Sequence, residues 1–337
     1  MVKVENKVAL VAGGAGFIGS HLCDRLIAEG AVVVCLDNFL TGRRENVRHF
    51  ERHPRFEIIE HDVIDPRTSS LCPGTRFTHI FHLACAASPT HYQADPEHTL
   101  LTNVVGTRNL LHLASDSGAR LLLASTSEVY GEPEVHPQPE DYRGSVNCTG
   151  PRACYDEGKR AAETLTFDFV RAGRCKARVA RLFNTYGPRM RADDGRVISN
   201  IVCQALEGDD ITIHGDGLQT RSFCFVDDTV EGLVRLMDSE HPTMPVNLGN
   251  PEELSVRELV DRVVALTGTK SRVVYRPLPL DDPRRRKPDI TRAVELLGWR
   301  PTIDLDHGLR KTIAWFEREE NRLVRAPAHA DSLVAAE

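Results

Sequence analysis

The sequence has no Cys-x-x-Cys pair, no hydrophobic run long enough to cross a membrane, and no excess of basic charge. Its nine cysteines lie scattered through apolar segments, so neither a zinc site nor a dithiol redox motif is indicated, and we expect small buried side chains. The longest uncharged apolar stretches have the length of strands, which argues against a membrane-spanning helix. Lys and Arg total 42 against 48 for Asp and Glu, so the charge gives no reason to expect a nucleic-acid partner.

The N-terminal segment 1–10 carries Lys3, Glu5 and Lys7 and lacks the apolar core of a secretory signal, so we expect a cytoplasmic protein with reduced thiols. The chain has 337 residues, of which 41% are hydrophobic and 27% charged, as is typical of a globular protein. A core of that size needs no disulfide or structural metal. We therefore expect one large domain or two ordinary ones, without a metal site.

Strand-like and helix-like stretches alternate through the first half of the chain. The segment 31–37 is β-branched and almost wholly apolar, which is typical of a strand buried on both faces of a parallel sheet. Further strands are expected at 7–12, 56–62, 79–84, 121–126 and 177–183, with helices at 19–29, 97–117 and 153–172. This order predicts an α/β fold with a doubly wound parallel sheet of the Rossmann type.

After Phe183 the pattern changes to turn formers and short elements. We expect a helix at 197–207 and strands at 211–214 and 222–226. A capping box opens another helix at 255–267. We interpret 1–183 as a Rossmann domain to which 222–250 return, 184–320 as mainly a smaller α+β nucleotide-sugar-binding domain, and 321–337 as a loose tail.

Three glycines, Gly13, Gly16 and Gly19, stand where the first strand turns into the first helix. Positions without side chains let the backbone approach a pyrophosphate, and a helix N-terminus favours its charge. Asp37 ends the second strand, where a carboxylate would bind the adenosine ribose and favour NAD over NADP. Asp62 ends the third strand and would either contact the adenine amino group or cap a helix. The alternative for the glycines is a tight turn that binds nothing.

Tyr155 and Lys159 lie four residues apart in a predicted helix, so both side chains share one face. A nearby ammonium and the positive charge of an oxidised nicotinamide would stabilise the phenolate and let the tyrosine act as a base near neutral pH. Thr126, at a strand end, could share the proton, and Glu128 adds a carboxylate to the same crevice. On spacing alone, a surface pair is the alternative.

These segments together resemble the extended short-chain dehydrogenase/reductases that act on nucleotide sugars, and in detail the UDP-glucuronate decarboxylases (UDP-xylose synthases). The similarity spans about residues 7 to 316 and is carried by the segments 37–39, 41–43, 126–131, 150–160, 187–190, 194–197, 219–221, 247–253 and 286–290. Three departures from the family pattern stand out: Ala12, the pair Cys85-Ala86, and His214. The second departure lies near the expected sugar pocket and bears on substrate preference.

The resemblance implies NAD as the cofactor, a UDP-sugar as the substrate, and a homodimer formed through 97–117 and 153–172. It implies these catalytic residues: Tyr155, Lys159, Thr126, Ser127, Glu128 and Arg286. It implies these cofactor contacts, besides Tyr155 and Lys159: Gly13, Gly16, Phe17, Ile18, Gly19, Asp37, Asn38, Phe39, Thr41, Gly42, Asp62, Val63, Leu83 and Ala84. The implied substrate contacts are Asn184, Arg189, Val197, His214, Gln219, Arg221 and Arg286, where Arg189 could instead brace the site and His214 could instead be structural. His82 is expected to be a core residue.

The implied reaction is the decarboxylation of UDP-glucuronate to UDP-xylose through 4-keto intermediates. Oxidation at C4 makes a β-keto acid, so the electrons left by carbon dioxide spread into an enolate, and returning the hydride makes the cycle redox-neutral.

Four other readings stay open. A 4,6-dehydratase would carry an Asp-Glu pair where this chain has Ser127-Glu128. A UDP-glucuronate 4-epimerase would keep the carboxylate, and a third variant would release the UDP-4-keto-pentose. A non-catalytic NAD-sensing protein would not need the tyrosine, lysine and threonine.

Overall fold

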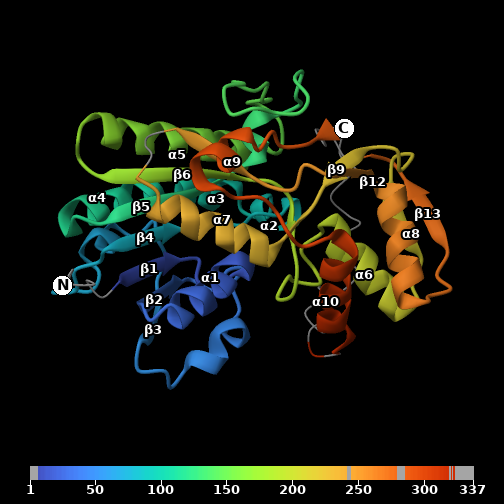
Figure 1. The fold of residues 1–337 in the computed structure, drawn as a ribbon, viewed down its shortest axis with the longest axis horizontal. Coiled ribbons are helices and arrows are strands. Elements are labelled where there is room, and N and C mark those ends of the chain that lie inside the picture. The colour runs from blue at the N-terminus through green and yellow to red at the C-terminus, as the bar shows by residue number, and fades with distance from the viewer. Residues whose placement is uncertain (1–6, 241–243, 279–284, 319, 321, 323–337) are drawn as a thin grey trace.

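The computed structural model describes residues 7–240, 244–278, 285–318, 320 and 322. Its centre is a seven-stranded parallel sheet in the order β11-β6-β5-β4-β1-β2-β3 (Figure 1). The strands are β1 (Val8–Ala12), β2 (Val32–Asp37), β3 (Phe56–Glu60), β4 (His79–His82), β5 (Arg120–Thr126), β6 (Lys176–Leu182) and β11 (Pro245–Leu248). The predicted doubly wound α/β fold is confirmed.

Alternate residues of each strand feed two separate cores, one on each face of the sheet. Ala9 and Val11 of β1 pack with α1 (Phe17–Ala28) and α7 (Val226–Asp238). Leu10 and Ala12 face the other way and pack with α4 (Thr107–Ser117) and α5 (Ala153–Arg171). Helices on both faces explain why the central strands β1 and β2 are almost wholly apolar.

The strand order reverses direction between β1 and β4. From β1 the chain proceeds to β2 and β3 on one side, and from β4 to β5 and β6 on the other. Crossovers diverge at such a switch point and leave a crevice beyond the carboxyl ends of the strands, where ligands bind in doubly wound folds. The glycine turn after β1 and the segment after β5 both open onto this crevice.

The later part of the chain builds a smaller region beside the sheet (Figure 1). It contains α6 (Val197–Glu207), α8 (Val256–Thr267) and α10 (Leu305–Glu317), the pair β8 (Ile211–His214) and β13 (Val273–Arg276), and the three strands β12 (Glu253–Ser255), β9 (Thr220–Ser222) and β14 (Arg285–Arg286). The expected capping box opens α8: Ser255 accepts from the Glu258 amide, and Glu258 accepts from the Ser255 amide. The division into two domains stays a prediction. The predicted tail 321–337 lies, apart from Arg322, outside the described residues.

Two predicted elements differ from the structure. The helix expected at 97–117 is α3 (Pro96–Leu101) and α4 joined by a π-helical turn, Thr102–Gly106. A Cβ at Gly106 would lie 2.6 Å from a methyl group of Val63, so this turn packs closely against the loop after β3. The strand expected at 222–226 is divided, because Ser222 pairs with β12 whereas Cys224 and Phe225, as β10, pair with β7 (Thr185–Tyr186).

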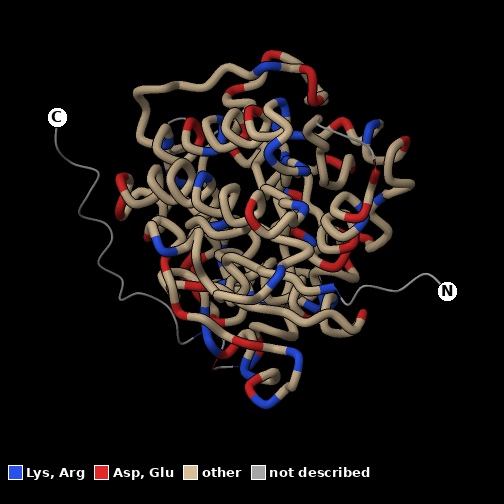
Figure 2. The backbone as a smooth tube through the Cα atoms, turned by 90° about the vertical axis from the view of Figure 1, so that its left-hand side faces the viewer, with Lys and Arg blue, Asp and Glu red and all other residues tan. Residues whose placement is uncertain are grey.

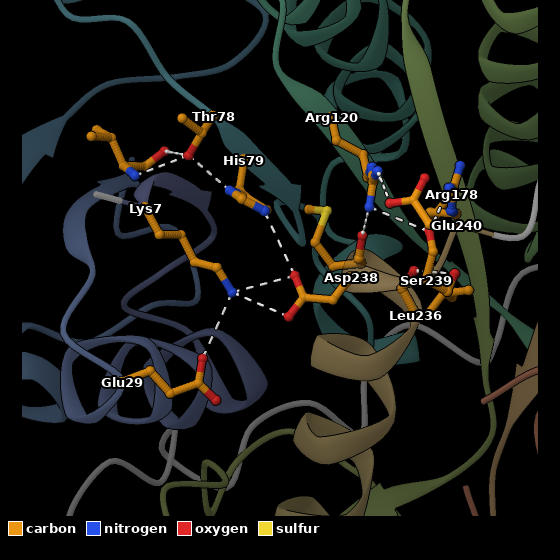
Figure 3. Close-up of polar contacts among 12 residues, drawn as sticks. Lys7, Glu29, Thr78, His79, Arg120, Arg178, Leu236, Asp238, Ser239 and Glu240 are labelled. Atoms are coloured by element: carbon orange, nitrogen blue, oxygen red, sulfur yellow. Dashed lines mark hydrogen bonds and ion pairs between the residues drawn. The ribbon is translucent and has the colours of Figure 1, made fainter. Parts of the chain in front are cut away.

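Charged side chains bind the C-terminal end of α7 to the sheet (Figure 3). These contacts lie where the strands begin, on the side of the sheet opposite the crevice. Asp238 binds Lys7 Nζ at 3.3 Å and lies 3.6 Å from His79 Nε2. Arg120 Nη1 donates to the Met237 carbonyl at 2.7 Å, and Arg178 Nη2 donates to the Ser239 carbonyl at 2.6 Å. The arginines thus satisfy carbonyls that a helix end leaves without intrahelical partners.

Acidic and basic residues are interspersed over the face that Figure 2 presents. Among the described residues, no helix combines the length and apolar character that a membrane crossing requires. Nor does this part of the chain hold a group of three or more His, Cys, Asp or Glu placed to bind a metal ion.

Candidate active site

Two glycines of the β1–α1 unit, Gly13 and Gly19, have no room for a side chain. Gly13 has φ +80°, and a Cβ there would lie 2.8 Å from the Ala84 amide nitrogen. A Cβ at Gly19 would lie 2.0 Å from the carbonyl oxygen of Gly13. No side chain caps the first turn of α1, so its amides face the crevice. Such a turn can hold a diphosphate against the backbone.

Asp37 is buried at the end of β2 and lies against the same turn. Its carboxylate accepts hydrogen bonds from the amides of Ala15 and Phe39, both at 2.9 Å. Burial raises the pKa of Asp37, and the hydrogen bonds from the Phe39, Ala15 and Gly16 amides oppose that rise. A Cβ at Gly42 would lie 2.6 Å from Asp37 Oδ1, so this loop also fits closely around the carboxylate.

Asp62 follows β3 and adds a second carboxylate to this part of the site; we call Asp37 and Asp62 together the acidic rim. Its Oδ2 accepts from Asn38 Nδ2 at 2.7 Å and lies 2.8 Å from His98 Nε2. Burial alone would raise the pKa of Asp62, but hydrogen bonds from the Ile64 amide, His98 and Asn38 lower it overall. The rim therefore offers two carboxylates to the hydroxyl and amino groups of a nucleoside, which fits a dinucleotide without a 2′-phosphate.

A cavity of about 590 Å³ runs from the glycine turn past the ends of β4 and β5 to the smaller region. It is lined by all but one of the residues predicted to contact cofactor or substrate or to act in catalysis, including Phe17, Ile18, Thr41, Val63, Leu83, Ala84, Ser127, Asn184, Val197 and Arg221. Phe39 is not among the lining residues; its amide binds Asp37, and its ring lies 4.2 Å from the guanidinium of Arg44. The fold thus gathers one site from distant segments.

Tyr155 and Lys159 of α5 both line this cavity. Lys159 Nζ donates to the Ala124 carbonyl at 2.9 Å and lies 5.8 Å from the centre of the Tyr155 ring. Burial raises the pKa of Tyr155 strongly; Cys85 and Glu128 add to the rise, and a hydrogen bond with Thr126 opposes it. Burial also lowers the pKa of Lys159. The site therefore favours the protonated phenol.

Tyr92, which the sequence analysis did not single out, stacks on the Tyr155 ring. It ends the short helix α2 (Pro89–Tyr92), and the two ring centres are 5.0 Å apart with the planes 7° from parallel. Its buried hydroxyl has no hydrogen-bond partner among the described residues, and burial raises its pKa. Stacking holds the Tyr155 ring in place. An isolated aromatic residue in a four-residue helix gave no sequence signal for this contact.

Glu128 is held between two arginines. Its Oε1 forms an ion pair with Arg286 Nη1, and its Oε2 accepts from Arg152 Nη2 at 2.6 Å. Burial would raise the pKa of Glu128, but the charges of Arg286 and Arg152 more than offset this and lower it to about 2. Arg286 is 3% exposed, and its Nε has no partner in the part of the chain that the structure describes. A second cation, Arg152, thus binds the carboxylate that pairs with Arg286. The sequence analysis assigned Arg152 no role.

The other predicted substrate contacts also line the cavity, and three of them have partners within the protein. Gln219 Nε2 donates to the His214 carbonyl at 2.5 Å, and the exposed His214 ring contacts the Pro277 carbonyl at 3.1 Å. Arg189 Nη2 lies 2.7 Å from Asp24 Oδ2 of α1, an ion pair that braces the wall. His82 is fully buried below the cavity, and burial lowers its pKa to about 3, so it is a neutral core residue.

Comparison with known proteins agrees with this site. Residues 9–249 match the model of the NAD dependent epimerase/dehydratase family. The chain is 56% identical to UDP-glucuronic acid decarboxylase 2 of Arabidopsis thaliana over 300 residues, which are 89% of this chain and 66% of that protein, or just under two thirds of its length. It is 52% identical to UDP-glucuronic acid decarboxylase 1 of Danio rerio over 315 residues, 94% of this chain and 74% of that one.

A solved structure extends the comparison to bound ligands. The UDP-glucuronic acid 4-epimerase of Bacillus cereus, in complex with UDP-glucuronic acid and NAD, superposes with a TM-score of 0.83 at 27% identity, covering 93% of this chain and 99% of that one. The chain therefore belongs to the NAD dependent epimerase/dehydratase family, in the branch of the UDP-glucuronic acid decarboxylases.

Proposed function

We propose that the protein decarboxylates UDP-glucuronate to UDP-xylose with NAD as a bound, recycled cofactor. The observation that carries this proposal is the partly buried Arg152–Glu128–Arg286 cluster, which lines the same cavity as Tyr155 and Lys159. It combines a site for oxidising a sugar hydroxyl with cations suited to a carboxylate. The decarboxylases that share 51–56% identity with the chain support the same reading.

The residues present fit NAD. The glycine turn, which a Cβ would fill, would hold the diphosphate, and Asp37 would hold the adenosine ribose and disfavour a 2′-phosphate. When bound, NAD supplies the hydride acceptor that turns C4 of the sugar into a ketone and the donor that restores it.

Tyr155 removes the proton of the C4 hydroxyl. Thr126, hydrogen-bonded to the phenol, shares that proton, and the Lys159 ammonium, fixed by the Ala124 carbonyl, stabilises the phenolate. In the last half of the cycle the phenol gives the proton back to the C4 oxygen. Stacking on Tyr92 keeps the ring in one orientation through both transfers.

The arginine cluster binds the carboxylate of the 4-keto-hexuronate. Arg286 and Arg152 orient it, and the bond from C5 to the carboxyl carbon breaks so that its electron pair enters the C4 carbonyl and carbon dioxide leaves. A proton then reaches C5 through water held by Glu128 and Arg286, giving UDP-4-keto-pentose. Ion pairing keeps Glu128 charged throughout, so it acts as an acceptor that fixes the two cations.

A UDP-glucuronate 4-epimerase is the second candidate, favoured by the superposition on the Bacillus cereus enzyme. Both activities begin with oxidation at C4, and they differ in whether the carboxylate is kept. The deciding experiment is product analysis by mass and proton NMR after incubation with NAD and UDP-glucuronate and no added reductant. UDP-xylose with carbon dioxide supports the proposal, whereas UDP-galacturonate supports the epimerase and UDP-4-keto-pentose supports early product release.

We also propose a homodimer formed through α3–α4 and α5. Leu100 and Leu101 of α3 are 40% and 36% exposed, although both are large and apolar, so a partner surface would cover them. Sedimentation of the wild-type chain and of a Leu100→Glu variant tests this: the proposal expects a dimer that the variant weakens. A cytoplasmic location stays a prediction.

A further inference from the structure

Asp156 is a buried carboxyl that the mechanism above does not use. It follows Tyr155 in the first turn of α5 and is 7% exposed. Its Oδ1 is fully buried and accepts no hydrogen bond from the described residues, and Asp156 is not among those that line the cavity. Burying a carboxylate oxygen without a partner is costly, so the site favours the neutral acid.

Charges from several elements face Asp156. They are Glu128 of η4 (Ser127–Tyr130), Arg286 of β14, Arg152 just before α5, and Glu157 of α5, together with the Tyr92 hydroxyl and the Cys154 thiol. Burial raises the pKa of Asp156 most, Glu128 and Glu157 raise it further, and Arg152 and Arg286 lower it, leaving it at about 7. The N-terminus of α5 favours the ionised carboxylate of Asp156, but the cost of burying that charge is larger. Both forms therefore exist near neutral pH.

The protonation of Asp156 decides the net charge of the cluster. Arg152, Arg286 and Glu128 carry two positive charges and one negative charge, so the cluster has one uncompensated positive charge while Asp156 is neutral. Ionised Asp156 would cancel it. A sugar carboxylate would then bind to a neutral cluster instead of a cationic one.

We propose that Asp156 is a positioning residue for specificity: in its neutral form it leaves the two arginines one positive charge, which selects nucleotide sugars that carry a carboxylate. This inference rests on the proposed function and names how its site tells UDP-glucuronate from UDP-glucose. Because the carboxylate and ionised Asp156 exclude each other, binding of UDP-glucuronate makes Asp156 take up a proton, whereas binding of UDP-glucose does not.

The test is calorimetry on the NAD-saturated Tyr155→Phe protein, which binds without turnover. Titrations in two buffers of different ionisation enthalpy at about pH 7.5 should show uptake of about half a proton or more with UDP-glucuronate and none with UDP-glucose. The affinity for UDP-glucuronate should fall about tenfold from about pH 6.5 to about pH 8, and that for UDP-glucose should not change. The titration with UDP-glucose is the control: subtracting its proton uptake removes the part that the shared nucleotide causes.

Adding Asp156→Asn should abolish both the proton uptake and the pH dependence. Glu157→Gln is the matched control: it removes the same charge from the next residue, whose carboxylate is 39% exposed and pairs with Arg160, and it should keep both effects. UDP-glucuronate binding without extra proton uptake, or uptake retained in Asp156→Asn, overturns the inference alone. If Asp156→Asn does not fold, the difference in proton uptake between UDP-glucuronate and UDP-glucose still tests the inference. Absence of decarboxylation by the native protein would instead overturn the proposed function.

Discussion

Replacing Arg152 with Gln removes one of the two cations that hold Glu128. The pKa of that carboxyl falls from 4.5 to about 2 in the folded protein. A fall of that size corresponds to about 3 kcal/mol in favour of the charged form, and Arg286 and Arg152 both contribute to it. Loss of Arg152 should therefore lower the free energy of unfolding at neutral pH by about 1–2 kcal/mol.

The pH dependence of this effect has a definite sign. Because the folded-state pKa of Glu128 is depressed, its stabilising contribution is present above about pH 4.5 and is lost as the pH falls toward about 2. The stability difference between wild type and Arg152→Gln should therefore shrink in acid. Urea denaturation near pH 7 and near pH 3 measures this difference.

The same change should reduce kcat/KM for UDP-glucuronate by about 30-fold to 100-fold, since it removes one charged hydrogen bond to the carboxylate cluster. NAD binding should not change, because the partner assigned to Arg152 is Glu128 and the proposed diphosphate site is the glycine turn. Arg171→Gln is the matched control: Arg171 is the last residue of α5, the helix that Arg152 precedes, its side chain is 67% exposed, and it pairs with the exposed Asp168. If Arg152→Gln matches this control in stability and in kcat/KM, the role assigned to the cluster is refuted.

Three further changes test other parts of the account. Tyr155→Phe should keep the fold and NAD binding and lose about a thousandfold or more in turnover, and wild-type turnover would refute the base assignment. Arg286→His should spare NAD binding, measured by fluorescence, and cut carbon dioxide release; an unchanged rate would remove that residue from the reaction. Asp228→Ala should destabilise the protein by about 2–4 kcal/mol in urea denaturation, because this buried carboxylate accepts from Thr302 N, Thr302 Oγ1 and Ile303 N at 2.9–3.0 Å. Asp227→Ala, at the neighbouring exposed position, should cost far less, and equal losses would contradict the assignment.

The sheet and the glycine turn could be predicted because their signals are local. An apolar strand such as 32–37 is recognisable from its own residues, and Gly13 and Gly19 are required by contacts within one strand-turn-helix unit. The helix at 97–117 was harder, since its π-helical turn depends on packing against Val63, far away in the sequence.

The catalytic cluster was only half predictable from the sequence. Glu128 and Arg286 are 158 positions apart; the family resemblance implied a catalytic role for each, but their ion pair with one another was not predicted. Arg152, Tyr92 and Asp156 were missed because their roles arise from tertiary contacts: an ion pair, a ring stack and burial beside other charges. None of these contacts has a spacing that a single sequence displays.

The central claim is that the hydride leaves C4 of the sugar and returns to the same carbon before release. UDP-glucuronate with deuterium at C4, incubated with the enzyme and NAD in ordinary water, tests this most directly. We predict UDP-xylose that retains the deuterium at C4 and carries a solvent hydrogen at C5, as seen by proton NMR. Pentose that has lost the deuterium to solvent, or a uronic product that keeps its carboxylate, would contradict the account.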